Sequence, residues 1–326
     1  MKITVLGAGA WGTALARILA RREHQVTLWD YFPETAETIN RAHVNERYLP
    51  GIILPENLRG EADTAKAVQG AELVVVASVS KGFRNATKCL ASFSGVVVSV
   101  TKGIELETGK TMTDILAETA PKAPIVAMSG PTLATEVAKG IPTAIVAAST
   151  DAQAAQTVQS LFHSHAFRVY TSTDVRGVEL GGALKNVIAI GAGVCDGLGF
   201  GDNSKAALVT RAVSELRRLG VACGAQADTF TGLSGLGDLM VTCFSKLSRN
   251  RGFGERLGKG EKAEAIVASM TAVAEGYPNA RSACELARKH GVQAPIIEQV
   301  HAMLYEGKDV RQAVQDLTAR ESKAED

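Results

Sequence analysis

The stretch ITVLGAGAWGTALAR, residues 3–17, sets the fold of the first half of the chain. The apolar run Ile3 to Leu6 is typical of a short buried strand. Glycines follow at once in the pattern G-x-G-x-x-G, and apolar residues then recur at helical spacing, so we expect a helix to begin near Ala10. A strand, a glycine-rich turn and a helix in this order are the context in which a dinucleotide is bound.

Each glycine of the turn has a separate predicted role. Gly7 permits the tight turn, Gly9 leaves room for a pyrophosphate to approach the backbone, and Gly12 lets the helix pack close to the strand. The start of the helix offers N–H groups and partial positive charge to the phosphates. A second strand, 25–29, ends at Asp30, where an acid would meet a ribose hydroxyl. The alternative is a tight turn that binds no ligand.

Composition bounds the classes of protein that remain possible. The chain has 326 residues, of which 46% are hydrophobic and 21% are charged, and its formal net charge is +1. This length favours two domains, because single cores stop growing near roughly 250–300 residues. The near-neutral charge and the scarcity of aromatic residues do not indicate a surface that binds nucleic acid or an anionic membrane. We expect neither as a partner.

The five cysteines indicate a reducing compartment. They are widely spaced, odd in number and without a C-x-x-C pair, which argues against a disulfide framework or a zinc knuckle. The first strand begins so early that no signal peptide is expected, and no apolar run reaches membrane-spanning length. The six histidines show no metal-ligand spacing, so no metal site is expected. The expected location is the cytoplasm.

Strands and helices alternate through the first half of the chain. This order predicts an α/β Rossmann-type, doubly wound parallel sheet, in which ligands bind at the carboxyl ends of the strands. A loop with two prolines is expected over 47–58, and a helix with Pro131 in its first turn is expected after 129–130. The expected strands are 3–6, 25–29, 73–77, 96–100, 125–128, 143–147 and 167–170. The expected helices are 33–41, 62–68, 79–90, 111–118 and 152–162.

From Asp174 onward the pattern is helical throughout. We expect a long helix over 175–195 with several interior glycines, each of which costs roughly 1 kcal/mol relative to alanine. Such a helix needs close backbone approach to another helix or to a ligand. Further helices are expected over 203–219, 226–230, 237–244, 249–257, 262–268, 279–290, 296–305 and 310–318, and a frayed tail over 319–326. The domains are therefore 1–172, binding a dinucleotide, and 173–326, an all-α substrate and catalytic domain.

Lys185 is the best candidate for an acid–base group. It lies in the middle of the long helix among small and apolar residues, and burial lowers the pKa of a lysine enough to make it usable in proton transfer. The alternative is a lysine that extends to solvent. Asp238 and Thr242 are four residues apart and share a helix face, so Asp238 is predicted to orient Lys185, although an acid there could instead cap its helix. Asn186 is placed to hold a substrate hydroxyl.

The run Ser248-Arg249-Asn250-Arg251 precedes a short helix. Ser248 can cap this helix, and its start together with Arg249 and Asn250 makes a good phosphate site. A solvated basic turn is the alternative. Lys102, at the end of the strand 96–100, is predicted to face the substrate or a cofactor phosphate.

Six motifs in order resemble the bacterial NAD(P)-dependent glycerol-3-phosphate dehydrogenases. They are GAGAWGTA (7–14), TKGIE (101–105), SGPT (129–132), ALKNVIAIGAG (183–193), GLGDL (235–239) and SRNR (248–251). The first is shared by many dehydrogenases, whereas the last four are specific. The resemblance implies reversible reduction of dihydroxyacetone phosphate to sn-glycerol 3-phosphate, the precursor of membrane phospholipids, with NAD or NADP as cofactor.

The resemblance also implies roles for individual residues. Lys185 would be the proton donor and acceptor. The residues implied at the substrate are Lys102, Gly130, Thr132, Asp238, Ser248, Arg249 and Asn250, with Asn186 and Thr242 lining the same pocket. Those implied at the cofactor, together with Gly7, Gly9, Ala10, Gly12 and Asp30 of the dinucleotide pattern, are Trp11, Tyr31, Lys102, Ala134, Arg249, Val273 and Glu275.

The end of the second strand departs from the family pattern. Members that use NADPH well tend to carry a basic residue there, but this chain has Asp30-Tyr31. An acid repels a 2′-phosphate and accepts from a free ribose hydroxyl. NADH is therefore predicted to work at least as well as NADPH.

Two other functions compete with this one. A related two-domain dehydrogenase for a 2-keto or 3-hydroxy acid would place a carboxylate at Arg249, and a non-catalytic redox sensor would bind the nucleotide and a partner protein. The sensor leaves Lys185 and Asp238 without a role. A homodimer through the helical domain is expected from its glycine-rich and apolar helix faces.

Overall fold

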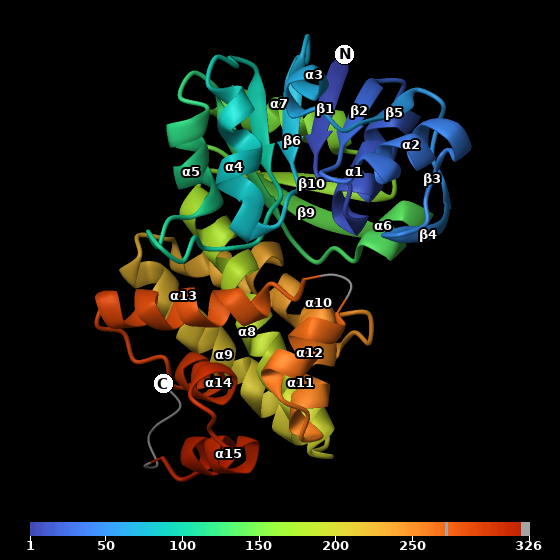
Figure 1. Cartoon of the computed structure of the whole chain (residues 1–326). Helices are drawn as coiled ribbons and strands as arrows, with labels where there is room; N and C mark the ends of the chain where they lie inside the picture. The colour runs from blue at the N-terminus through green and yellow to red at the C-terminus, as the bar shows by residue number, and fades with distance from the viewer. Residues whose placement is uncertain (271–272, 321–326) are drawn as a thin grey trace. The chain divides into compact units, whose positions relative to one another are not determined.

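The computed structural model describes residues 1–270 and 273–320, which form two compact units, Met1–Leu180 and Gly181–Asp326 (Figure 1). They are called unit 1 and unit 2 below. Unit 1 holds a sheet with helices around it, whereas every element of unit 2 within the described residues is helical. The expected combination of an α/β Rossmann-type unit and an all-α unit is confirmed.

Unit 1 is built on an eight-stranded sheet in the order β10-β9-β8-β7-β6-β1-β2-β5. β1 pairs in parallel with β2 on one side and with β6 on the other, so strand order reverses at β1. Ligands bind at such a reversal, beyond the carboxyl ends of the strands. The strands are β1 (Lys2–Leu6), β2 (Gln25–Trp29), β5 (Leu58–Glu61), β6 (Leu73–Val76), β7 (Val96–Ser99), β8 (Ile125–Ser129), β9 (Thr143–Ala148) and β10 (Phe167–Ser172).

The sheet departs from the expected parallel arrangement between β8 and β9. These two strands pair antiparallel, so β9 and β10 run against the other six strands. The connecting helix α6 (Ala134–Lys139) has only 6 residues. It spans about 9 Å, less than the roughly 17 Å of a five-residue strand, so the helix alone does not carry the chain back along the sheet, and β9 begins at the edge where β8 ended.

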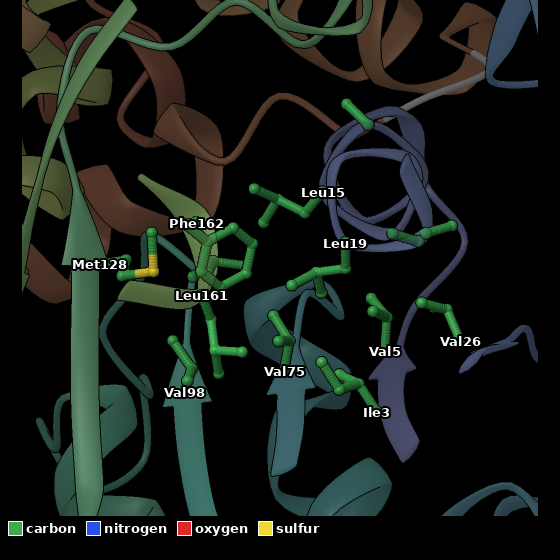
Figure 2. Close-up of a cluster of buried hydrophobic side chains, with 14 of the residues drawn as sticks. Ile3, Val5, Leu15, Leu19, Val26, Val75, Val98, Met128, Leu161 and Phe162 are labelled. Atoms are coloured by element: carbon green, nitrogen blue, oxygen red, sulfur yellow. The ribbon is translucent and has the colours of Figure 1, made fainter. Parts of the chain in front are cut away.

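Helices cover both faces of the sheet, as a doubly wound fold requires. On one face, Leu15 and Leu19 of α1 (Ala10–Arg21) and Phe162 of α7 (Ala152–Phe162) meet sheet residues such as Val75 (Figure 2). On the other, Leu116 and its neighbours in α5 (Met112–Thr119) pack on the strands. Burying one such aliphatic side chain contributes about 1.5–3 kcal/mol. The remaining helices of unit 1 are α2 (Pro33–Ala42), α3 (Thr64–Val68) and α4 (Phe83–Thr87).

The prediction of a loop over 47–58 is wrong. The chain forms an antiparallel pair, β3 (Val44–Asn45) with β4 (Leu49–Ile53), and then the edge strand β5. β4 contains Pro50, which a strand tolerates when it has a free edge. β4 was not predicted because it contains a proline, and β5 was not predicted because only one of its residues, Leu58, is buried. Neither strand therefore has a strong hydrophobic pattern.

Two helix predictions in unit 1 also need correction. The helix expected over 79–90 is instead three consecutive pieces, the 3₁₀ turn η1 (Ser80–Gly82), α4 and the 3₁₀ turn η2 (Lys88–Leu90), and at the second boundary the Thr87 hydroxyl donates to the carbonyls of Phe83 and Arg84 at 3.0 and 3.2 Å. Pro131 lies before α6 rather than in its first turn, since α6 is preceded by Leu133 as its N-cap.

Unit 2 contains most of the long helix α8 (Val175–Gly197) and the helices that follow it. These are α9 (Asp202–Ala222), η3 (Ala227–Thr231), η4 (Leu233–Gly237, a π-helix), α10 (Asp238–Phe244), α11 (Arg249–Gly258), α12 (Ala263–Ser269), α13 (Gly276–Lys289), α14 (Pro295–Tyr305) and α15 (Val310–Thr318). In length and composition α8 resembles a membrane-spanning helix, but its most apolar window is entirely buried. Most of the tail predicted to fray, residues 321–326, lies outside the described residues.

Glycines of α8 allow this helix to lie close to another helix. A Cβ at Gly193 would lie 2.0 Å from the Arg251 carbonyl oxygen, and one at Gly254 of α11 would lie 1.9 Å from the Ile190 carbonyl oxygen. Such separations are impossible for any larger residue without a backbone shift. The two helices therefore approach backbone to backbone, which explains why a helix with costly interior glycines is stable here.

Candidate active site

The glycine-rich turn of unit 1 has the geometry that a pyrophosphate needs. Gly7 has φ +117°, and a Cβ at Gly12 would lie 1.9 Å from the Gly7 carbonyl oxygen, so both positions require glycine. A Cβ at Gly9 would meet nothing within 4 Å. Gly9 is also the N-cap of α1 and no side chain caps this helix end, so the amides at the start of α1 face open space. The turn fits a dinucleotide.

Asn45 holds this turn from the side. Its amide donates to the carbonyl oxygen of Ala8 at 2.7 Å and to the hydroxyl of Thr13 at 2.8 Å, and it is almost fully buried. The Thr13 hydroxyl also donates to Ala8 at 3.0 Å. Sequence reasoning missed Asn45, because nothing in the spacing of residues connects the β3 strand to the turn after β1.

Asp30 is at the end of β2 as expected, but its carboxylate is turned inward. It is only 6% exposed, and its Oδ1 accepts from the Phe32 amide at 2.9 Å. Burial raises the pKa of Asp30, while the amides of Phe32 and Ala8 and the charge of Arg47 oppose that shift. The neighbouring Tyr31 is 76% exposed.

Lys102, Gly130 and Thr132 come together beyond the ends of β7 and β8. The Lys102 ammonium donates to the carbonyl oxygen of Gly130 at 3.1 Å and to the hydroxyl of Thr132 at 3.5 Å. The chain between these residues and Ala134, the first residue of α6, is not helical. β1, β7 and β8 run in the same direction, so this cluster lies on the same edge of the sheet as the glycine-rich turn.

Lys185, Asp238 and Thr242 form a buried polar cluster in unit 2. The Lys185 Nζ donates to the Asp238 Oδ1 at 2.5 Å and to the Thr242 hydroxyl at 2.6 Å. The three residues are 5%, 0% and 5% exposed. The predicted pairing of Lys185 with Asp238 is confirmed, and a lysine that extends to solvent is excluded.

The local fold explains how these residues meet. A Cβ at Gly181 would lie 2.6 Å from the Ser234 carbonyl oxygen, so α8 and the π-helix η4 touch through their backbones just before Asp238. Residues 238 and 242 share one face of α10, one turn apart. Asp238 and Thr242 are therefore presented together to the side chain of Lys185.

The start of α11 is organised by hydrogen bonds to asparagines. Ser248 caps the helix by accepting from the Arg251 amide at 3.2 Å, as expected. Asn250 donates to Asn186 Oδ1 at 2.9 Å, and its own Oδ1 accepts from the Gly276 amide at 2.9 Å. Asn186 thus braces Asn250 and holds the start of α11 beside the start of α13.

Arg249 and Arg251 differ in their surroundings. Arg251 is 9% exposed and its Nε pairs with Asp196 at 2.6 Å, so the alternative of a solvated basic turn is wrong for this residue. Arg249 is exposed at the start of α11. Although the residue is exposed, neighbouring protein atoms withdraw part of its guanidinium from water and so lower the pKa of Arg249, a shift that the Glu275 carboxylate opposes. Arg249 is therefore the cation of this run that is placed to meet an anion.

The remaining cofactor residues implied by the resemblance lie in two places. Trp11, in the first turn of α1, and Ala134, at the start of α6, are both partly buried against the core of unit 1. Val273 is 46% exposed, and Glu275 is the N-cap of α13 in unit 2.

An open phosphate-binding turn and a buried lysine held by a carboxylate define a dinucleotide-dependent oxidoreductase. The sequence matches the family profile described as NAD-dependent glycerol-3-phosphate dehydrogenase, its N-terminal part over residues 2–155 and its C-terminal part over residues 174–315. The chain belongs to this family.

Individual relatives cover the whole chain. It is 50% identical to a glycerol-3-phosphate dehydrogenase [NAD(P)+] of Anaeromyxobacter dehalogenans (strain 2CP-C), covering 100% of each chain. It is 45% identical to one of Chlorobium phaeobacteroides (strain BS1), covering 100% of this chain and 99% of the relative. The crystal structure of a glycerol-3-phosphate dehydrogenase from Coxiella burnetii is 38% identical, with a TM-score of 0.94 over 98% of this chain and 99% of that one.

Proposed function

We infer that the protein reversibly reduces dihydroxyacetone phosphate to sn-glycerol 3-phosphate with NAD(P)H. The observation that carries this inference is the buried Lys185 ammonium, held by Asp238 and Thr242 at 2.5 and 2.6 Å, in a chain of this family. Reduction of a ketone needs an acid at the carbonyl oxygen, and a fixed ammonium supplies one. The product serves as the backbone precursor of phospholipids.

Lys185 acts on the oxygen of the reacting carbon. When bound, the reduced nicotinamide supplies the hydride that this carbon accepts. The Lys185 ammonium stabilises the negative charge that develops on the oxygen and donates its proton there; in the reverse direction the neutral amine removes the proton from the alcohol. Asp238 and Thr242 keep Nζ in one position, so little reorganisation is needed during the reaction.

The start of α11 binds the substrate phosphate in this proposal. Arg249 supplies a guanidinium suited to two hydrogen bonds with a phosphate, and the amides at the helix start add partial positive charge. Ser248, Asn250 and Asn186 shape the site. Lys102, with Gly130 and Thr132, completes the set of residues assigned to the substrate.

The cofactor assignment rests on the open turn at Gly9. Gly7, Gly9 and Gly12 form the pyrophosphate site with the amides of Ala10 and Trp11. Asp30 and Tyr31 lie toward the adenosine end, and the other residues assigned to the cofactor are Lys102, Ala134, Arg249, Val273 and Glu275. NADH is proposed to work at least as well as NADPH. The proposed functional domains are 1–172 and 173–326.

The proposal extends to the setting of the enzyme. It operates in the cytoplasm, with a phosphorylated triose as its partner and no nucleic acid or membrane. Exposed apolar side chains on and after α10, Phe244 and Leu247 among them, support a homodimer through unit 2.

The test follows NADH absorbance with purified protein and dihydroxyacetone phosphate. Wild type is expected to oxidise NADH, and Lys185→Ala to lose this activity while still binding NADH. Lys246→Ala, which removes an exposed lysine of unit 2, is the matched control and should retain activity. Oxidation with a carboxylated 2-keto acid but not with the phosphorylated triose would overturn the substrate assignment. Full activity of Lys185→Ala would overturn the assigned acid.

A further inference from the structure

Arg47 brings a positive charge to the end of β2 from another part of the chain. It lies in the turn between β3 and β4 and is exposed. Its Cζ is 4.3 Å from the centroid of the Phe32 ring, and Phe32 follows β2 as the N-cap of α2. The guanidinium is thus held over the segment that leaves the second strand, although no basic residue occurs there in the sequence.

The aromatic rings around Arg47 fix its position. Besides Phe32, the ring of Tyr48 lies 5.2 Å from the Arg47 Cζ. Phe32 in turn makes an edge contact with Tyr31, with ring centroids 5.4 Å apart. A guanidinium stacked on an aromatic face keeps its N–H groups free to bind in the plane of the guanidinium.

Of the charges of Asp30 and Arg47, the positive one is therefore the one that faces solvent. Asp30 is buried and accepts from the Phe32 amide, whereas Arg47 is exposed and makes no ion pair with any residue in 1–270 or 273–320. The charge of Arg47 acts on Asp30 and lowers its pKa against the larger, opposite effect of burial. A ligand that approaches from solvent meets the guanidinium before the carboxylate.

We propose that Arg47 determines specificity at the cofactor site by binding the 2′-phosphate of NADP(H). In dinucleotide-binding folds the end of the second strand meets the adenosine ribose, which carries a free 2′-hydroxyl in NAD and a phosphate in NADP. The planar fork of an arginine matches a phosphate with two hydrogen bonds. Arg47 thereby offsets the repulsion expected from Asp30 and adds NADPH to the cofactors that the enzyme accepts.

The proposal rests on the dinucleotide site proposed for unit 1, and its test separates the two. The probes are 5′-AMP and 2′,5′-ADP, which differ only in the 2′-phosphate, and binding is measured by titration calorimetry without substrate. Arg47→Gln removes the charge at an exposed turn. Arg41→Gln removes a matched exposed charge from the last turn of α2 and is the control.

Wild type and Arg41→Gln should bind both probes. Arg47→Gln should bind 2′,5′-ADP roughly 10–100-fold more weakly, as expected when charged hydrogen bonds are lost, with affinity for 5′-AMP within about twofold of wild type. Equal affinities of Arg47→Gln and wild type for 2′,5′-ADP would overturn the role of Arg47, as would equal weakening of both probes. If wild type binds neither probe, the dinucleotide site itself is wrong.

A second measurement does not depend on the variant. The wild-type affinity for 2′,5′-ADP should fall more steeply with added salt than the affinity for 5′-AMP, because the extra contact is between exposed charges. An equal salt dependence of the two wild-type affinities would overturn the proposal even if Arg47→Gln fails to fold.

Discussion

The turn after β1 and the middle of α8 both depend on glycine, but for opposite reasons. At Gly9 the missing side chain leaves open space, since a Cβ there would meet nothing within 4 Å. At Gly193 and Gly254 the space is filled by the backbone of a second helix. Glycine therefore marks a ligand site only where its surroundings are empty, and the sequence alone does not distinguish these cases.

The two regions also provide polar groups in different ways. The turn offers backbone amides that need no ionisable side chain, whereas α8 places a charged lysine among buried residues and balances it with Asp238. A buried charge is costly unless it is paired and hydrogen-bonded. We expect Gly9 of the turn to tolerate substitution with little loss of stability, and α8 to be sensitive in both stability and activity.

The largest effect is expected at the contact between α8 and α11. Gly254→Ala would place a Cβ 1.9 Å from the Ile190 carbonyl oxygen, so the helices must separate. Unfolding by urea should show a loss of about 4 kcal/mol or more, the range typical of severe mutations. Gly252→Ala on the same helix has open space around it and should instead gain up to about 1 kcal/mol from helix propensity. Similar stabilities of the two variants would contradict the close contact.

The next effect is expected from breaking the buried pair. Asp238→Asn leaves the Lys185 ammonium without its counter-charge, which typically costs about 3–5 kcal/mol of folding free energy. The same change should lower kcat, because Nζ loses its fixed position. Asp228→Asn, at an exposed carboxylate of unit 2, should leave both stability and kcat unchanged. If Asp238→Asn behaves like this control, Asp238 does not hold Lys185.

The smallest effect on folding is expected at Gly9, where a substitution should nevertheless clearly weaken NADH binding. Its backbone angles, φ −61° and ψ 174°, suit alanine, so Gly9→Ala should change stability by less than about 1 kcal/mol. The added methyl group would occupy the path of the pyrophosphate and weaken NADH binding, by an expected factor of about ten, or 1.4 kcal/mol. Fluorescence titration with NADH measures this. Unchanged affinity would place the pyrophosphate elsewhere.

Sequence patterns predicted those parts of the fold in which buried residues recur at a regular spacing. The apolar runs of β1, β6 and β7 and the long helix α8 were visible because burial leaves a regular hydrophobic signal. The pair β3–β4 and the edge strand β5 were hidden, since few of their residues face the core. The reversed direction of β9 was also not predictable from residue types, because it depends on the path of the connection around α6.

The candidate site likewise contains residues that the sequence predicted and residues that it did not. Lys185 was predicted as an acid–base group because it lies among apolar residues, and Asp238 was predicted to orient it because it shares a helix face with Thr242. Asn45 and Arg47 were missed, because their importance comes only from proximity to segments distant in the sequence. Asp30 shows the reverse problem: its position along the chain was expected, but its carboxylate is turned inward to the Phe32 amide.

The buried length of α8 has a consequence for the newly made chain. α8 ends at Gly197, while α11, whose backbone covers it, ends at Gly258, about 60 residues later. At roughly 5–20 residues per second, the ribosome needs several seconds to make that segment. During this time a 23-residue apolar helix, with the composition of a membrane span, waits for its covering helix. A ribosome that stalls within this window leaves α8 without the helix that packs on its backbone, so the burial of α8 depends on a segment that is made after it.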